Sequence, residues 1–186
     1  MCKENEIVIP LKTLLEEHGE EKVKTLLNSF SCSKNWDVER FLKNTAILFE
    51  KLNKSRTYLI FKKGTTDILA YFTITISILK IVDEDISNKT LKKLDGISKE
   101  KIEFPVYLIG QLGKNDKFWN ETSGKFILET AISYIYDANE IVGGRVILIE
   151  TLNIEKLIKF YKENWKRNFN RICANVQNNL IALSQK

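Results

Sequence analysis

Histidine, cysteine and long apolar runs are scarce in this chain of 186 residues. The single histidine, His18, stands beside Gly19 at a predicted helix end, so a histidine-based triad or metal site would depend on it alone. A solvated side chain is the simpler interpretation. Three cysteines are too few and too far apart for a disulfide framework or a metal cluster: Cys2, Cys32 and Cys173. We therefore expect no metal cofactor and a reducing, cytoplasmic setting.

The chain also lacks the features of a membrane or exported protein. No stretch approaches the ~18 apolar residues that can span a bilayer, and the opening "MCKENEIVIPLK" has no apolar signal core. The net charge is +5, from 29 basic and 24 acidic residues. This moderate excess is compatible with an anionic ligand or RNA but is below that of a dedicated nucleic-acid binder. A hydrophobic content of 44% is typical of a globular protein with a core.

The first third of the sequence is predicted to be helical. Two short helices over 10–18 and 20–30 form an N-terminal extension over residues 1–30. Their apolar positions follow helical spacing: Leu11, Leu14, Leu15, Val23, Leu26 and Leu27. A third helix is capped by Ser33 or Asn35 and runs to about Leu52. Its apolar face consists of Val38, Phe41, Leu42, Ala46 and Phe49.

A β-hairpin follows, over residues 56–63 and 68–81. In its second strand, Phe72, Ile74, Ile76 and Ile78 alternate with small polar residues, which predicts that these four face the core of a half-buried strand. Residues 82–101 are charged and weakly patterned. They are predicted to be a surface excursion with a short helix over 89–94.

The second half alternates strands and helices. "IEFPVYLIGQL" predicts a central strand. The next helix ends at Gly143 and Gly144, and its buried face is predicted to hold Ile127, Ala131, Tyr134, Ala138 and Ile141. "RVILIET" predicts a buried strand, "NIEKLIKFYKENW" a helix capped by Asn153, and "FNRICANV" and "LIALSQK" two closing strands. The whole chain, 1–186, is predicted to be one α/β (α+β) domain with a mixed sheet.

Four motifs in this order resemble the GNAT family of N-acetyltransferases. "VYLIGQLGKN" resembles the strand that pairs with the pantetheine arm of CoA, and "WNETSGKFILETA" stands at the pyrophosphate loop, (Q/R)-x-x-G-x-(G/A). "LIKFYKEN" resembles the helix whose tyrosine lies near the CoA sulfur. "SFSCSKNWDVERFL" is similar to the opening of a subgroup that includes tRNA-acetylating toxins. The resemblance covers roughly residues 30–183 and implies a mixed central sheet flanked by helices.

The family also implies a site for acetyl-CoA. The residues assigned to it are Leu112, Gly113, Lys114, Trp119, Thr122, Ser123, Gly124, Lys125 and Asn153. A helix N-terminus offers unpaired N–H groups and partial positive charge to a diphosphate, and Gly124 would let the backbone approach closely. From the residues alone, Ser123 and Gly124 indicate only a helix cap. The chain departs from the motif at Trp119, where the family has Gln or Arg, and at Thr122, where it has glycine.

The implied chemistry is direct attack of an amine on the thioester. A backbone N–H near Leu112 would stabilise the oxyanion, Tyr161 would act as general acid toward the departing thiolate, and Glu150 is the candidate base. Without the resemblance, Tyr161 is simply a core tyrosine on an amphipathic helix.

The predicted function is therefore a cytoplasmic bacterial acyl-CoA-dependent N-acetyltransferase. Two alternatives remain open: a catalytically degenerate scaffold that binds or regulates a partner, and a toxin-like transferase that acts on aminoacyl-tRNA. The expected partners are an amine substrate, with tRNA and a second copy of the chain as further candidates, and no membrane.

Overall fold

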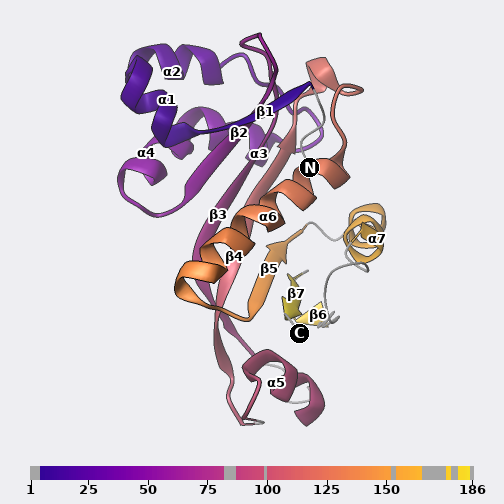
Figure 1. Ribbon diagram of the computed structural model, residues 1–186. Helices are drawn as coiled ribbons and strands as arrows, with labels where there is room; N and C mark the ends of the chain where they lie inside the picture. Colours follow the sequence, from indigo (N-terminus) through magenta and orange to yellow (C-terminus); the bar gives the residue numbers. More distant parts are fainter. Residues whose placement is uncertain are drawn as a thin grey trace. The chain divides into compact units, whose positions relative to one another are not determined.

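The computed structural model describes residues 5–81, 87–98, 100–151, 154–164, 175–176 and 180–184 (Figure 1). The chain groups into two compact units, one formed by Met1–Thr75 and Gly110–Ile135 and the other by Ile76–Ile109 and Tyr136–Lys186. Three elements pass from one unit to the other: β3 (Ile68–Lys80), β4 (Glu103–Lys114) and α6 (Gly124–Val142). The expectation of a single domain stays a prediction.

The first unit begins with a strand that the sequence patterns did not reveal. β1 (Glu6–Pro10) pairs antiparallel with β2 (Arg56–Lys62), and Val8 lies opposite Ile60. Its partner is some fifty residues away, so no local pattern marks it. The predicted helices follow as α1 (Leu11–His18) and α2 (Glu20–Leu27). They bury the apolar positions Leu11, Leu14, Val23 and Leu27.

The third predicted helix is present but interrupted. It consists of α3 (Trp36–Arg40), a π-helical segment (Phe41–Thr45) and α4 (Ala46–Lys51). Asn35 is its cap, because the Asn35 Oδ1 atom accepts a hydrogen bond from the Val38 N–H at 3.4 Å. Much of the predicted apolar face is buried in the core of this unit: Val38, Leu42 and Ala46.

The predicted hairpin is confirmed, but the face assignment of its second strand is wrong beyond Thr75. β2 and β3 pair antiparallel. Along β3, Phe72 is buried as expected, whereas Ile76 and Ile78 are 72% and 67% exposed and Leu79 is buried. The first six residues of β3 are all buried, so both of its faces are covered there. Period-two alternation shows that two faces differ, but it does not show which one meets a core.

The second unit has its own strands and core. β4 pairs in parallel with β5 (Val146–Glu150) over Val106–Ile109. β5 pairs antiparallel with β7 (Leu180–Ser184). β7 also pairs antiparallel with β6 (Asn175–Val176). The predicted short helix is α5 (Asn88–Asp95). Buried side chains around it form the core: Leu79, Ile81, Leu91, Leu94, Phe104, Val106, Val146 and Leu148.

Strand pairing runs in the order β1-β2-β3-β4-β5-β7-β6, which makes β4 a central strand, as predicted. The sheet is mixed, because β4–β5 is parallel and the other described pairings are antiparallel. None of the described helices is long and apolar enough to span a membrane.

The predicted face of the long helix α6 is confirmed in its first half, whereas Tyr134 and Ala138 are only half-buried. Ile127 and Ala131 are buried, but Ile141 is 83% exposed, which contradicts the prediction for the last turn. That turn precedes Gly143, where φ is 71°. The predicted helix α7 (Glu155–Asn164) is present. Its proposed cap, Asn153, and most of "FNRICANV" lie outside the described residues.

Candidate functional site

The end of β4 is fixed to the start of β3 by Asn115, which is fully buried. The Asn115 backbone N–H donates to the Leu69 carbonyl oxygen at 2.8 Å, and its Nδ2 group donates to the Ile68 carbonyl oxygen at 2.8 Å. Both bonds run from this buried residue to the first two residues of β3, and buried hydrogen bonds of this kind hold the backbone in place. The loop toward α6 therefore starts from a fixed point.

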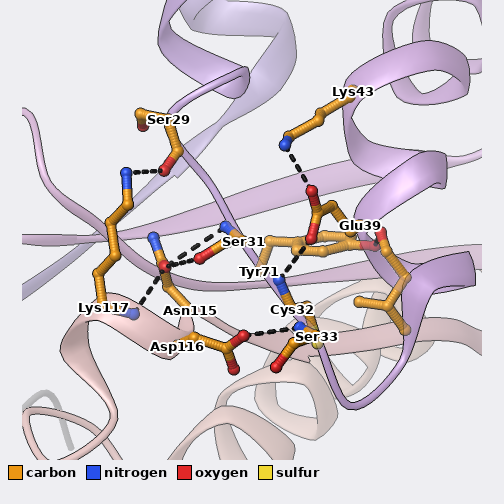
Figure 2. Close-up of polar contacts among 11 residues, drawn as sticks. Ser29, Ser31, Cys32, Ser33, Glu39, Lys43, Tyr71, Asn115, Asp116 and Lys117 are labelled. Atoms are coloured by element: carbon orange, nitrogen blue, oxygen red, sulfur yellow. Dashed lines mark hydrogen bonds and ion pairs between the residues drawn. The ribbon is translucent and has the colours of Figure 1, made fainter.

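The acceptor atom of the same side chain reaches the segment that precedes α3 (Figure 2). The Asn115 Oδ1 atom accepts from the Ser31 N–H at 3.4 Å, from the Ser31 hydroxyl at 3.3 Å, and from the Lys117 N–H at 3.1 Å. This last bond caps a single 3₁₀ turn, Asp116–Phe118. Asn115 thus joins β3, the loop after β4 and residues 29–33.

Asp116 and Lys117 strengthen the same junction. The Asp116 N–H donates to the Ser31 carbonyl oxygen at 2.9 Å, and the Asp116 Oδ2 atom accepts from the Ser33 N–H at 2.6 Å. That N–H lowers the pKa of the Asp116 carboxyl. Lys117 donates from Nζ to the Ser29 carbonyl oxygen at 3.0 Å. Asn115 and Asp116 are not among the residues predicted for the site, although an Asn–Asp pair directly after an apolar strand is a signal for a capped turn.

Cys32 lies in this junction as a buried side chain. Burial raises the pKa of its thiol, so the nucleophilic thiolate is disfavoured. Its backbone N–H donates to the Glu39 Oε2 atom at 2.7 Å, and Lys43 donates to Glu39 Oε1 at 2.6 Å. These bonds fix the segment to α3.

Gly113, a predicted cofactor residue, is required by packing. A Cβ atom there would lie 2.4 Å from Val38 Cγ1 and 2.8 Å from Tyr71 Cε1. Tyr71 is fully buried and donates its hydroxyl to the Val38 carbonyl oxygen at 2.5 Å. Beside it, Leu112 is half-buried. The pairing of β4 with β5 covers Val106–Ile109, whereas β4 itself continues to Lys114.

Lys114, Trp119 and Thr122 are brought together, as the predicted site requires. The Lys114 Nζ atom donates to the Thr122 carbonyl oxygen at 3.0 Å and lies 3.9 Å from the centroid of the Trp119 ring. Lys34, which is not among the predicted site residues, places its Nζ atom 3.8 Å from the same centroid. Burial and the charge of Lys34 lower the pKa of Lys114. No spacing in the sequence could link Lys34 to this loop.

The start of α6 has the predicted cap. The Ser123 Oγ atom accepts from the Phe126 N–H at 3.1 Å, and Gly124 is the first helical residue. Thr122 is only 4% exposed, and its hydroxyl has no hydrogen-bond partner among the described residues. Lys125 is exposed, and its Nζ atom lies 3.8 Å from the Glu129 Oε1 atom. The helix end thus combines partly unpaired N–H groups, one unpartnered buried hydroxyl and nearby lysines.

Two predicted catalytic residues belong to the second unit. Tyr161, on α7, is 7% exposed, and its ring packs edge-on against Phe160 at a centroid distance of 5.1 Å. Burial raises the pKa of Tyr161 to about 12, so its hydroxyl keeps its proton at neutral pH. Glu150 is exposed at the end of β5, opposite Leu180. In the part of the chain that the structure describes, no group of histidine, cysteine and carboxylate side chains could hold a metal ion.

No protein-family model and no curated protein matches this sequence. The fold, however, is similar to that of the toxin AtaT and of KacT. AtaT complexed with acetyl-methionyl-tRNAfMet has a TM-score of 0.69 and 19% identity, covering 97% of this chain and 94% of that one. A tyrosine-to-phenylalanine mutant of KacT has a TM-score of 0.71 and 17% identity, covering 97% of this chain and 95% of that one. A tyrosine-to-phenylalanine mutant of AtaT, bound to the C-terminus of the antitoxin AtaR and to acetyl-CoA, has a TM-score of 0.66 and 15% identity. The match covers 97% of this chain and 94% of that one. The chain has the GNAT fold that its motifs predicted.

Proposed function

We propose that this chain is an N-acetyltransferase that moves the acetyl group of acetyl-CoA to the amine of an aminoacyl-tRNA. The observation that carries the proposal is the shared fold, over nearly the whole chain, with a protein solved together with an acetylated aminoacyl-tRNA. Because one fold can serve many reactions, the proposal also rests on the residues of the site. The net charge of +5 is suited to a polyanionic substrate.

The start of α6 fits the diphosphate of acetyl-CoA. The first N–H groups of a helix have no partner within the helix, and its dipole favours an anion. Ser123 satisfies one of these groups by accepting from the Phe126 N–H. Thr122 adds a buried hydroxyl that has no partner among the described residues, and the Lys114 ammonium group lies against the Thr122 carbonyl. The described part of this helix end therefore offers donors and positive charge to a phosphate.

The other assigned residues have roles that follow from their chemistry. The part of β4 beyond Ile109 continues past its pairing with β5, so we assign the Leu112 N–H to the pantetheine arm or the thioester oxygen. The attacking amine forms a C–N bond as the C–S bond breaks. Glu150 accepts the proton of the amine, and Tyr161, protonated at neutral pH, donates to the leaving sulfur.

A second candidate function is favoured by one observation. Tyr161 is only 7% exposed and packs beside Phe160, as a purely structural core tyrosine would. Trp119 and Thr122 also depart from the family motif in the loop. Together these features support a scaffold that binds or regulates a partner without acetyl transfer. The two candidates differ in what Tyr161 does, which kinetics can measure.

Partners of the chain follow from the same comparison. AtaT is bound to the C-terminus of its antitoxin in one of the similar structures. We propose a protein antitoxin as a partner here too, in the cytoplasm of a bacterium. A second copy of the chain is a further candidate partner, and the oligomeric state can be measured by light scattering at several concentrations.

The deciding experiment has two steps. Calorimetric titration of the full chain with acetyl-CoA is expected to show binding, and the absence of heat at millimolar concentration would rule out the enzyme. Labelled acetyl-CoA is then incubated with aminoacylated and with uncharged tRNA. Label is expected only on the aminoacylated form, and no transfer to any aminoacyl-tRNA would rule out this acceptor.

The matched variant is Tyr161→Phe, which removes one hydroxyl and keeps the ring. Losing a general acid is expected to lower kcat by about 10²- to 10⁴-fold while acetyl-CoA binding is kept. Circular dichroism confirms that the variant is folded. An unchanged kcat would show that Tyr161 is a structural residue and would remove it from the mechanism.

A further inference from the structure

The first unit holds a cluster of two lysines and one tryptophan that the sequence does not bring together. We name Lys34, Trp119 and Lys114 the lysine–tryptophan cluster. Both ammonium nitrogens lie within 4 Å of the Trp119 ring centroid, at 3.8 Å for Lys34 and 3.9 Å for Lys114. Trp119 is 46% exposed, so the cluster is open to solvent. An indole ring attracts cations and can therefore hold both ammonium groups in place.

The cluster carries more positive than negative charge. Among the described residues, neither lysine belongs to an ion pair. The carboxylate that interacts with Lys34 through space is Asp116, and its Oδ2 atom already accepts from the Ser33 N–H at 2.6 Å. Glu121, in the same loop, is paired with Lys62 at 2.8 Å. Burial, and then the charge of Lys34, lower the pKa of the Lys114 ammonium group. Two cations held together in this way favour an anion.

The cluster is adjacent to the helix end described above. Lys114 donates to the Thr122 carbonyl oxygen at 3.0 Å, and Ser123, the next residue, caps α6. Each nitrogen is less than 4 Å from the same centroid, so the two are less than 8 Å apart. Phosphate oxygens that accept from both nitrogens at about 2.8 Å can bridge such a separation.

We propose that Lys34 and Lys114 form a phosphate-binding pair, positioned by Trp119, that binds a phosphate group of acetyl-CoA. The inference deepens the proposed function and rests on it. The charge that an arginine at position 119 would provide comes instead from a lysine at the end of β4 and a lysine in the turn before α3. Trp119 is a positioning residue, because it acts through the two ammonium groups.

Neighbouring hydrogen bonds explain how the cluster is held. Lys34 directly follows Ser33, whose N–H donates to Asp116, and the 3₁₀ turn that starts at Asp116 leads to Trp119. Asn115 joins the two segments, since its Oδ1 atom accepts from both Ser31 and Lys117. The backbone on either side of the cluster is thus fixed before any ligand binds.

The test compares two probes that differ in phosphate. Acetyl-CoA carries phosphates, whereas acetyl-pantetheine presents the same thioester and arm without them. Lys34→Gln and Lys114→Gln are expected to weaken acetyl-CoA binding roughly tenfold each, as for loss of one charge-assisted hydrogen bond, and to leave acetyl-pantetheine affinity unchanged. Lys34→Arg should restore most of the loss. Lys22→Gln, at an exposed position on α2 with the same charge change, is the control and should bind like wild type.

Trp119 has a readout of its own. Trp119→Leu is expected to weaken acetyl-CoA binding several-fold because the ammonium groups are no longer held, and Trp119→Phe is expected to weaken it less. Acetyl-pantetheine affinity should again be unchanged, which a general disturbance of the fold would not allow.

The outcomes separate this inference from the proposed function. If wild type binds acetyl-CoA and both glutamine variants bind it within twofold, the phosphate-binding pair is refuted and the acetyltransferase is not. If wild type does not bind acetyl-CoA, the proposed function fails. Inorganic pyrophosphate, titrated while tryptophan fluorescence is recorded, then supports a phosphate site if the signal is lost in Lys34→Gln, and refutes it if it is not. Lysine variants that lose only tRNA affinity would assign the pair to RNA and overturn the proposal.

Discussion

Replacing Asn115 by alanine should be among the most damaging single changes in the first unit. The side chain is fully buried, with one bond of 2.8 Å to the Ile68 carbonyl, one of 3.1 Å from the Lys117 N–H, and two longer bonds from Ser31. The Ile68 carbonyl would lose this side-chain donor in a buried place, at a cost of about 1–3 kcal/mol. The more exposed partners can turn to water and lose less. The expected destabilisation is about 2–4 kcal/mol.

Urea denaturation followed by circular dichroism measures this change. Asn120→Ala, at an exposed position in the same loop, is the matched control and should stay within about 0.5 kcal/mol of wild type. A loss below about 1 kcal/mol for Asn115→Ala would refute the view that this residue anchors the loop. Acetyl-CoA affinity, measured where the variant is still folded, should fall as well, because Lys34 and Trp119 flank the anchor.

Asn115→Asp sharpens the same test. The aspartate keeps the acceptor oxygens but places a negative charge, with no donor, against the Ile68 carbonyl. Burial would raise the pKa of this new carboxyl above its unfolded value. The protonated form restores a donor, so the stability lost at neutral pH should be partly regained as the pH falls below that raised pKa. Equal destabilisation at pH 7 and at about pH 4 would contradict this account.

Further predictions concern packing, acid stability and catalysis. Gly113→Ala should destabilise the protein by about 1–3 kcal/mol in urea, because its Cβ would lie 2.4 Å from Val38 and 2.8 Å from Tyr71; an unchanged midpoint would exclude this contact. Folding lowers the pKa of the Glu39 carboxyl below its ordinary value of 4.5. The contribution of this carboxylate to the free energy of unfolding is therefore present above pH 4.5 and is lost as the pH falls through the pKa of the folded state. Glu39→Gln should therefore cost about 1 kcal/mol at pH 7 and almost nothing in strong acid, as denaturation at both pH values can show. Because the pKa of Tyr161 is about 12, loss of its proton should not lower the rate of acetyl transfer up to about pH 10. If the wild-type rate falls below about pH 10 and Tyr161→Phe abolishes that fall, this prediction is wrong.

Local patterns in the sequence identified the elements well where short-range contacts decide the structure. The cap at Asn35, the helices α1 and α2, and the capped start of α6 at Ser123 depend on residues three or four positions apart. The same patterns could not decide which face of β3 meets a core, so Ile76 and Ile78 were assigned to the wrong side. β1 was missed because its hydrogen bonds go to a distant strand.

In the candidate site too, local patterns predicted some features and long-range contacts decided the others. The sequence by itself determined the order of strands and helices from α1 onward, the cap of α6, and the departures at Trp119 and Thr122 that made the loop unusual. Only the tertiary structure decided what compensates for them. It fixed the end of β4 to the segment before α3 through Asn115, and so placed Lys34 and Lys114 against the Trp119 ring. Contacts of this kind join residues far apart in the chain, and their formation depends on how strands pair rather than on any local spacing.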